Sequence, residues 1–366
     1  MVEIGDRVLA IPTEMRKSAV VGLVPLSAGD KSADIGGVGV RLVTPEVGDR
    51  IVAVTDELGK RMVVKINPAG WTRMTATAEW AARDYSAMAA LPDGSVVIAG
   101  GYSSVKLNDV WRSTDLGKTW TQMTASAGWA ARYGHTMVAL SDGSLVLAGG
   151  QDGTYTFNDV WRSTDNGANW TRQTEHAGWA DRNVHRSVAL ADNTIIVTAG
   201  YDFTNAYHDV WKSVNLGVDW TQVTADAGFG HRYLTALVLD GEGGLVIVGG
   251  WVLGTGSMND VWRSTNNGAN WTRLVEHAGW SDRWGLVAEC MTNGKILMTA
   301  GKETYGPQLH DVWLSSDYGA TWVQQTDADW TARSYPCSAR LTDGSIMIAG
   351  GNTASGKAND VWRYRY

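Results

Sequence analysis

The chain has 366 residues, a hydrophobic fraction of 44% and a formal net charge of −7. This composition allows a sizeable apolar core, and the acidic balance argues against nucleic acid as a partner, because nucleic-acid affinity comes from Lys and Arg that neutralise phosphates. No apolar run approaches the roughly 18 residues of a membrane span, and no secretory signal is visible at residues 1–6, so we expect a cytoplasmic protein or a virion component exposed after assembly.

Residues 1–69 contain an internal duplication. Residues 5–11 (GDRVLAI) recur as residues 48–54 (GDRIVAV), and a second apolar stretch follows each copy, at residues 19–23 and 62–66. The alternation and the β-branched content predict two hairpins in a small β domain. A domain of this size is marginal alone, so we expect residues 1–69 to pack on the rest of the chain, on a second copy or on a larger assembly.

Residues 70–366 are built from a repeat of about 50 residues. The segment DVWRSTDLGKTW begins at Asp109 and recurs, with changes and one truncation, at Asp159, Asp209, Asp260, Asp311 and Asp360. A period of this length with strand-like content predicts a propeller or another repeat array. Of the 19 Trp, all but Trp251 and Trp284 fall at repeated positions, which marks them as packing residues.

One repeat predicts four antiparallel strands, at residues 86–91, 95–101, 109–114 and 120–124, called A to D below. Four such strands form a propeller blade, and the repeats give six blades. Strand D occurs first at residues 71–75, from Trp71 to Thr75, without strands A to C before it, whereas the last repeat lacks strand D. We therefore expect residues 71–75 to complete the last blade and to remove an exposed edge.

The repeat resembles two known families. Strand B ends in Gly-Gly and strands C and D carry aromatic residues, as in a kelch repeat. The pattern Ser-x-Asp-x-Gly-x-x-Trp, complete from Ser113, Ser163 and Ser315 and carrying Asn215 or Asn266 in two other copies, resembles the Asp-box (BNR) motif of sialidase-like proteins. The resemblance implies an all-β, six-bladed propeller, but both motifs occur in glycosidases, lectins and scaffolds. In the box we expect the Asp or Asn to accept hydrogen bonds from backbone N–H groups two or three residues later.

An Arg recurs in every repeat, three residues after an aromatic side chain. The Arg residues are Arg83, Arg132, Arg182, Arg232, Arg283 and Arg333, and the aromatic residues are Trp80, Trp129, Trp179, Phe229, Trp280 and Trp330. One interpretation is a ring at the channel mouth that binds carboxylates or sugars. The other is that each Arg pairs with the Asp that opens strand C, and the perfect repetition favours this structural role.

Positions that break the repeat are better ligand candidates. They lie after the Arg and in the loops between strands B and C, which we expect on one face of the propeller: Asp84, Tyr85, Tyr133, His135, Asp152, Asn183, His185, Asp202, Tyr233, Trp251, Trp284, Glu303 and Tyr335. Aromatic rings combined with Asn, Asp and His suit contact with a glycan or a protein.

Signals for catalysis are weak. The Arg-Ile-Pro motif of sialidases is missing, the carboxylates of the variable face are scattered rather than paired, and the seven His show no metal-ligand spacing. We expect no metal site and no cofactor, and we expect Cys290 and Cys337 to be free thiols. The favoured function is a non-enzymatic binding protein for a glycan or protein receptor, such as a virion component. The alternatives are a glycan-active hydrolase or lyase and an intracellular or cell-surface scaffold.

Overall fold

The computed structural model describes residues 20–22, 50–55, 61–66 and 70–366. The chain divides into two compact units between Gly70 and Trp71. In the smaller unit, β1 (Val20–Gly22), β2 (Arg50–Thr55) and β3 (Arg61–Ile66) form an antiparallel sheet in the order β1-β2-β3. The second predicted hairpin is confirmed as β2 and β3, whereas residues 5–11 of the first hairpin lie outside the described residues.

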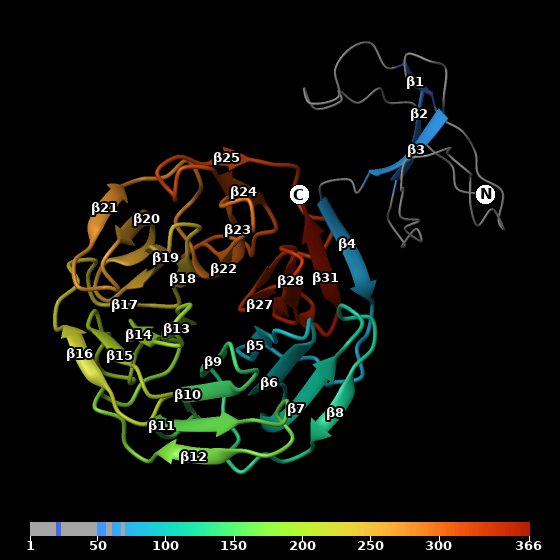
Figure 1. The fold of residues 1–366 in the computed structure, drawn as a ribbon. Coiled ribbons are helices and arrows are strands. Elements are labelled where there is room, and N and C mark those ends of the chain that lie inside the picture. The colour runs from blue at the N-terminus through green and yellow to red at the C-terminus, as the bar shows by residue number, and fades with distance from the viewer. Residues whose placement is uncertain (1–19, 23–49, 56–60, 67–69) are drawn as a thin grey trace. The chain divides into compact units, whose positions relative to one another are not determined.

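The larger unit is an all-β propeller, as predicted. Among the described residues, six antiparallel sheets of four or five strands follow one another around a ring, with strand A of each sheet nearest the centre (Figure 1). We number these sheets as blades 1 to 6 in chain order. Strands A to D of blade 1 are β5 (Ala87–Ala90), β6 (Val96–Tyr102), β7 (Lys106–Ser113) and β8 (Thr121–Thr124). Those of blade 2 are β9 (Thr136–Ala139), β10 (Leu145–Gln151), β11 (Thr156–Ser163) and β12 (Thr171–Thr174).

The next three blades repeat this order. Blade 3 consists of β13 (Arg186–Ala189), β14 (Ile195–Thr198), β15 (Val210–Ser213) and β16 (Thr221–Thr224). Blade 4 consists of β18 (Ala236–Leu239), β19 (Leu245–Val252), β20 (Gly256–Ser264) and β21 (Thr272–Val275), and β17 (Arg232–Tyr233) also pairs with β19. Blade 5 consists of β22 (Trp284–Cys290), β23 (Ile296–Lys302), β24 (Val312–Ser315) and β25 (Val323–Gln324).

Blade 6 joins the two ends of the propeller. Its strand order is β27-β28-β31-β4, in which β27 (Cys337–Arg340), β28 (Ile346–Ala349) and β31 (Val361–Arg365) come from the last repeat and β4 (Gly70–Thr75) precedes the first. In Figure 1 the blue β4 lies beside the dark red β31. The closure predicted from the missing strand D is thus confirmed. A short sheet of β26 (Arg333–Ser334), β29 (Asn352–Thr353) and β30 (Gly356–Lys357) adjoins this blade in the sequence.

Pairs of aromatic rings fill the spaces between neighbouring blades. The Trp or Phe three residues before each repeated Arg is buried and meets the first Trp of a strand D edge to face. The ring centroids lie 5.3–6.1 Å apart at interplanar angles of 86–89° in all six pairs: Trp80–Trp120, Trp129–Trp170, Trp179–Trp220, Phe229–Trp271, Trp280–Trp322 and Trp330–Trp71. This geometry is the one that the quadrupoles of aromatic rings favour.

The Ser-x-Asp-x-Gly-x-x-Trp segment forms the turn between strands C and D. In blade 1, Ser113 Oγ accepts the N–H of Gly117 at 2.8 Å, and Asp115 Oδ1 accepts those of Lys118 and Thr119 at 3.1 and 3.0 Å. The bonds of Asp115 therefore reach three and four residues along, one further than we expected. Gly117 has a φ of 85°, and a Cβ there would lie 2.8 Å from Val361 in blade 6. The turn thus packs on the preceding blade and requires glycine.

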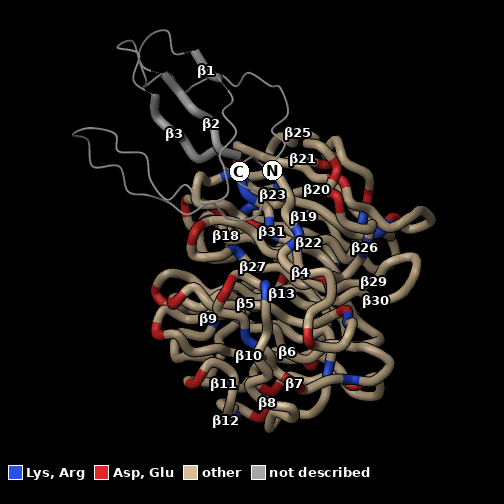
Figure 2. Tube along the Cα trace, turned by 90° about the vertical axis from the view of Figure 1, so that its right-hand side faces the viewer, with Lys and Arg blue, Asp and Glu red and all other residues tan. Residues whose placement is uncertain are grey.

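Each repeated Arg pairs with the Asp that opens strand C, as the structural interpretation predicts. Arg132 Nη1 and Nη2 donate to the two carboxylate oxygens of Asp159 at 2.5 and 2.9 Å, Nη1 also donates to the carbonyl of Gly149, and Trp161 Nε1 donates to the same Asp. The six Arg are at most 1% exposed. The other pairs are Arg83–Asp109, Arg182–Asp209, Arg232–Asp260, Arg283–Asp311 and Arg333–Asp360. Basic and acidic positions are accordingly interspersed through the blades (Figure 2).

Deletion of residues 71–75 should sharply destabilise the propeller. The deletion removes strand D of blade 6, exposes the edge of β31 and takes away Trp71, whose ring packs on Trp330 and Tyr364. We expect a clear fall in the thermal unfolding midpoint measured by circular dichroism. An unchanged midpoint would contradict closure through β4.

Replacement of Arg132 by Met should cost about 3–5 kcal/mol of unfolding free energy, because it leaves the carboxylate of Asp159 without its buried partner. The matched control is Arg172→Met in the Arg172–Glu175 pair, whose side chains are 46% and 62% exposed, and for which we expect about 0–1 kcal/mol. Denaturant unfolding of both variants measures the difference. Equal losses would show that the buried pair has no special structural role.

Candidate functional site

The candidate site lies on the face formed by two sets of segments, which we call the loop face. One set follows each repeated Arg, and the other set joins strands B and C. Single β-bridges hold the two sets side by side, for example between Asp84 and Tyr102, between Tyr133 and Gln151 and between Asn183 and Tyr201. The structure therefore groups the two kinds of segment as the sequence suggested.

A closed ring of backbone hydrogen bonds surrounds the propeller axis. One residue of each blade, two positions after the repeated Arg, donates its N–H to the carbonyl of the equivalent residue in the preceding blade, at 2.7–3.4 Å. We call this set the backbone ring; its members are Tyr85, Gly134, Val184, Leu234, Gly285 and Tyr335. All six have φ between 47° and 66°, a conformation that costs non-glycine residues energy and that persists only where the surroundings impose it.

Half-buried aromatic side chains form a chain of contacts across the loop face. Neighbouring ring centroids lie 3.9–6.4 Å apart along the whole chain. We call this set the aromatic arc; in order of contact it consists of Tyr102, Tyr133, Tyr85, Tyr335, Trp284 and Trp251. Tyr85 and Tyr335, which belong to the backbone ring, stack at 3.9 Å in its middle. The arc brings together five of the predicted site residues, from Tyr85 to Tyr335 in the sequence.

A partly buried ion pair lies at one end of the arc. Lys357 Nζ donates to Asp84 Oδ1 at 2.8 Å and to the carbonyl of Tyr102 at 2.9 Å, and it lies 3.6 Å from the centroid of the Tyr102 ring. Burial raises the pKa of Asp84, and the bond from Lys357 opposes that rise. Asp84 was among the predicted site residues, whereas Lys357 was not. The position of Lys357, a cation in a loop between strands B and C, could have indicated that it belongs to the loop face.

The other predicted residues of the loop face lie outside the arc. Asp152 and Asp202 each accept two backbone N–H groups within their own loops, and these bonds hold the pKa of both carboxyls below the usual value. Asn183 is buried and donates to the carbonyl of Tyr201. Tyr233 stacks on Tyr201 at 4.8 Å in a second aromatic pair. Glu303 is half-buried at the start of the β23–β24 loop.

His135 and His185 lie beneath the loop face, which corrects their assignment to it. They follow the backbone ring in the sequence, are 4% and 0% exposed, and pack on Trp129 and Trp179 at 5.8 Å. Burial lowers the pKa of His135 to about 3 and lowers that of His185 well below its usual value. Both imidazoles are therefore neutral at pH 7, and neither is positioned to meet a ligand on the outer surface.

Exposed apolar side chains mark the tips of the loops between strands B and C. Five of the six loops expose a large apolar side chain, and none of these five residues was among the predicted site residues. We call this set the loop-tip crown, and it consists of Val105 (59% exposed), Tyr155 (68%), Phe203 (43%), Leu253 (44%) and Tyr305 (101%). Five such tips on one face suit an interaction surface better than a single exposed apolar residue would.

Within the described ranges, no cluster of three or more His, Cys, Asp or Glu has the geometry to hold a metal ion. Cys290 and Cys337 are buried free thiols in the inner strands β22 and β27. The part of the chain that the structure describes also has no helix of the length and apolarity needed to cross a membrane.

Acidification should destabilise the propeller well above the range in which carboxylates titrate. Because the folded pKa of His135 is about 3 and the unfolded value is about 6.5, the unfolded chain binds the additional proton. The stability that neutral His135 contributes is complete above about pH 6.5 and is lost as the pH falls toward 3, by about 1.4 kcal/mol per pH unit. Replacing His135 by Leu should flatten the dependence of unfolding free energy on pH between 6 and 4.5. The exposed His176→Leu control should keep the wild-type slope, and equal slopes in both variants would contradict the assignment.

Comparison with known proteins supports the fold and goes no further. No protein-family model matches the chain, and no curated protein matches it. Among solved structures, one titled "Structure of YjhT" superposes with a TM-score of 0.66 at 17% sequence identity, over 79% of this chain and 96% of that chain. A likeness at this identity establishes a shared propeller-like fold.

Proposed function

We propose that the protein is a non-enzymatic binding protein that takes a glycan on its loop face. The observation that carries this proposal is the aromatic arc, which presents half-buried Tyr and Trp rings from five blades as one surface. Such rings offer flat faces to the C–H groups of sugars, and their polar edges remain available for hydrogen bonds. The kelch-like and Asp-box repeats serve as the scaffold for this surface.

The rings of the arc are already fixed before any ligand arrives. Tyr85 is held between Tyr335 and Tyr133, and Trp284 between Tyr335 and Trp251. A ligand that stacks on them therefore loses little side-chain entropy of the protein, which favours affinity. Lys357 and Asp84, at the Tyr102 end, add polar groups that orient a ligand relative to the stacked rings.

The carboxylates support binding in preference to hydrolysis. A glycosidase needs two carboxyl groups that face each other across the scissile bond. On this face Asp152 and Asp202 are used within their own loops and Asp84 is bonded to Lys357. Glu303 lies in blade 5, at the start of the loop between β23 and β24.

A protein partner is the second candidate, because the loop-tip crown surrounds the arc with exposed apolar side chains. Tyr155 and Tyr305 are the most exposed of these. Protein interfaces commonly depend on a few such aromatic anchors. In this case the tips, more than the arc, would determine affinity.

The combined substitution Tyr133→Ala and Trp284→Ala should weaken glycan binding by about tenfold or more, since buried aromatic anchors typically contribute more than 1 kcal/mol each. A glycan array followed by titration calorimetry on the best binder measures the loss. The matched control is Tyr318→Ala, which removes an aromatic ring from the Asp-box turn between β24 and β25, outside the loop face.

Three results would separate the alternatives. Wild-type protein that binds no glycan but captures a protein through Tyr155 and Tyr305 would favour the scaffold function. Equal losses of glycan binding in the control and the double variant would move the site away from the arc. Turnover of chromogenic glycosides that Asp84→Asn or Glu303→Gln abolishes would overturn the non-enzymatic assignment.

A further inference from the structure

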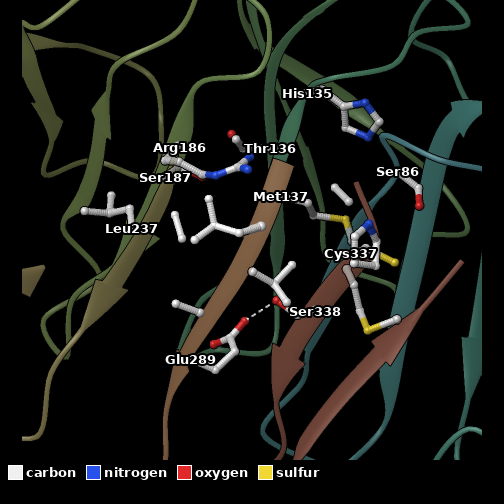
Figure 3. Close-up of a pocket in the computed structure, with 17 residues that line it drawn as sticks. Ser86, His135, Thr136, Met137, Arg186, Ser187, Leu237, Glu289, Cys337 and Ser338 are labelled. Carbon is white, nitrogen blue, oxygen red and sulfur yellow. Dashed lines mark hydrogen bonds between the residues drawn. The ribbon is translucent and has the colours of Figure 1, made fainter. Parts of the chain in front are cut away.

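A cavity lies on the propeller axis, directly after the backbone ring in the sequence of every blade. The inner strands of all six blades line it, and its volume is about 150 Å³ (Figure 3). We call it the axial cavity. Since one water molecule occupies about 30 Å³ of liquid, the space corresponds to about five water molecules or a ligand of similar size. None of the residues that line the cavity belongs to the aromatic arc, so the two regions are distinct.

Two oppositely charged side chains border the cavity and break the six-fold repeat. Arg186 occupies a position of strand A that is small or apolar in most other blades, as the strand registers show: Ala87, Thr136, Ala236, Val287 and Cys337. Glu289 likewise replaces Ala89, Val138, Val188, Val238 and Ala339. Five blades thus pack without the Arg and five without the Glu, so neither charge is required by the blade architecture.

The two charges do not neutralise each other by direct contact. Among the described residues, no ion pair within 4.0 Å joins Arg186 to Glu289 or to any other carboxylate, although the two attract each other over a longer distance. Within the part of the chain that the structure describes, Arg186 donates to the backbone carbonyls of Thr235 and His185 and to no side chain. Glu289 Oε1 accepts one bond, from Ser338 Oγ at 2.7 Å (Figure 3).

Burial acts against both charged forms, lowering the pKa of Arg186 to about 10 and raising that of Glu289. Both side chains are half-buried, and Arg340 as well as Arg186 attracts Glu289 over a longer distance. Because no ion pair within 4.0 Å involves either side chain among the described residues, a ligand in the cavity can supply a direct counter-charge to each. His135 also lines the cavity, and both of its ring nitrogens are buried without a hydrogen-bond partner.

We propose that the axial cavity binds a small zwitterion of the α-amino acid class, with its carboxylate at Arg186 and its ammonium group at Glu289. Two opposite charges in the lining of one small cavity match a molecule that carries both charges a few bonds apart. Arg186 is suited to the carboxylate because guanidinium groups form charge-assisted hydrogen bonds with carboxylate oxygens. Glu289 and Ser338 accept hydrogen bonds from the ammonium group. The volume restricts the ligand to amino acids with small side chains.

The test uses the full-length protein and named probes. Glycine, L-alanine and L-serine are titrated by calorimetry and by thermal shift, with acetate and ethylammonium as probes that carry one charge each. At least one amino acid should bind and raise the unfolding temperature as its concentration rises, whereas acetate and ethylammonium should bind at least about tenfold more weakly. Arg186→Met and Glu289→Gln should each weaken amino-acid binding by about 10- to 100-fold, the range expected for a lost hydrogen bond to a charged group.

Val214→Ala, a change at a 71% exposed position away from the cavity, is the control and should bind as wild type does. Glu289→Gln keeps the side-chain shape and remains decisive if Arg186→Met fails to fold, which circular dichroism reports. The proposal is overturned if no tested amino acid binds, if the single-charge probes bind equally well, or if Glu289→Gln binds the amino acid with unchanged affinity.

Discussion

The buried bidentate pair between Arg and Asp is the interaction on which the arrangement of the loop face depends. In every blade it ties the segment that enters strand A to the Asp before the Val-Trp pair of strand C, and the Arg also donates to the carbonyl near the end of strand B. The segment that follows the Arg is therefore held at one place and in one orientation. The six anchors place the next residues around the axis, where their backbone groups complete the backbone ring.

The backbone ring in turn divides the centre of the propeller into two environments. On one side Tyr85 and Tyr335 contribute their rings to the aromatic arc. On the other side the following residues turn inward, so that His135 is buried and the inner strands enclose the axial cavity. Residues that recur in every blade thus position residues that differ between blades on both sides of the ring. This explains why the candidate ligand-binding groups are found at positions that depart from the repeat.

Most of the fold could be predicted from the sequence because the same strand pattern recurs in six repeats. The missing strand D of the last blade predicted the closure through β4, and the recurrence of Arg132 and Asp159 in every repeat, 26 to 28 residues apart, predicted the buried pairs. The backbone ring could not be predicted, because only two of its members are glycine and Tyr85 and Val184 carry no signal for a positive φ. The sequence distinguishes loop-face residues from buried ones poorly, so His135 was assigned to the wrong environment. The charges of Arg186 and Glu289 were overlooked because they lie within predicted core strands, where their meaning depends on the cavity between blades.

A crystal structure of the full-length protein with a bound glycan tests the central claim most directly. The account predicts that sugar rings stack on Tyr133, Tyr85, Tyr335 or Trp284, with the backbone ring intact beneath them. A glycan bound at the turns between strands C and D, or one that enters the axial cavity by opening the backbone ring, would contradict it.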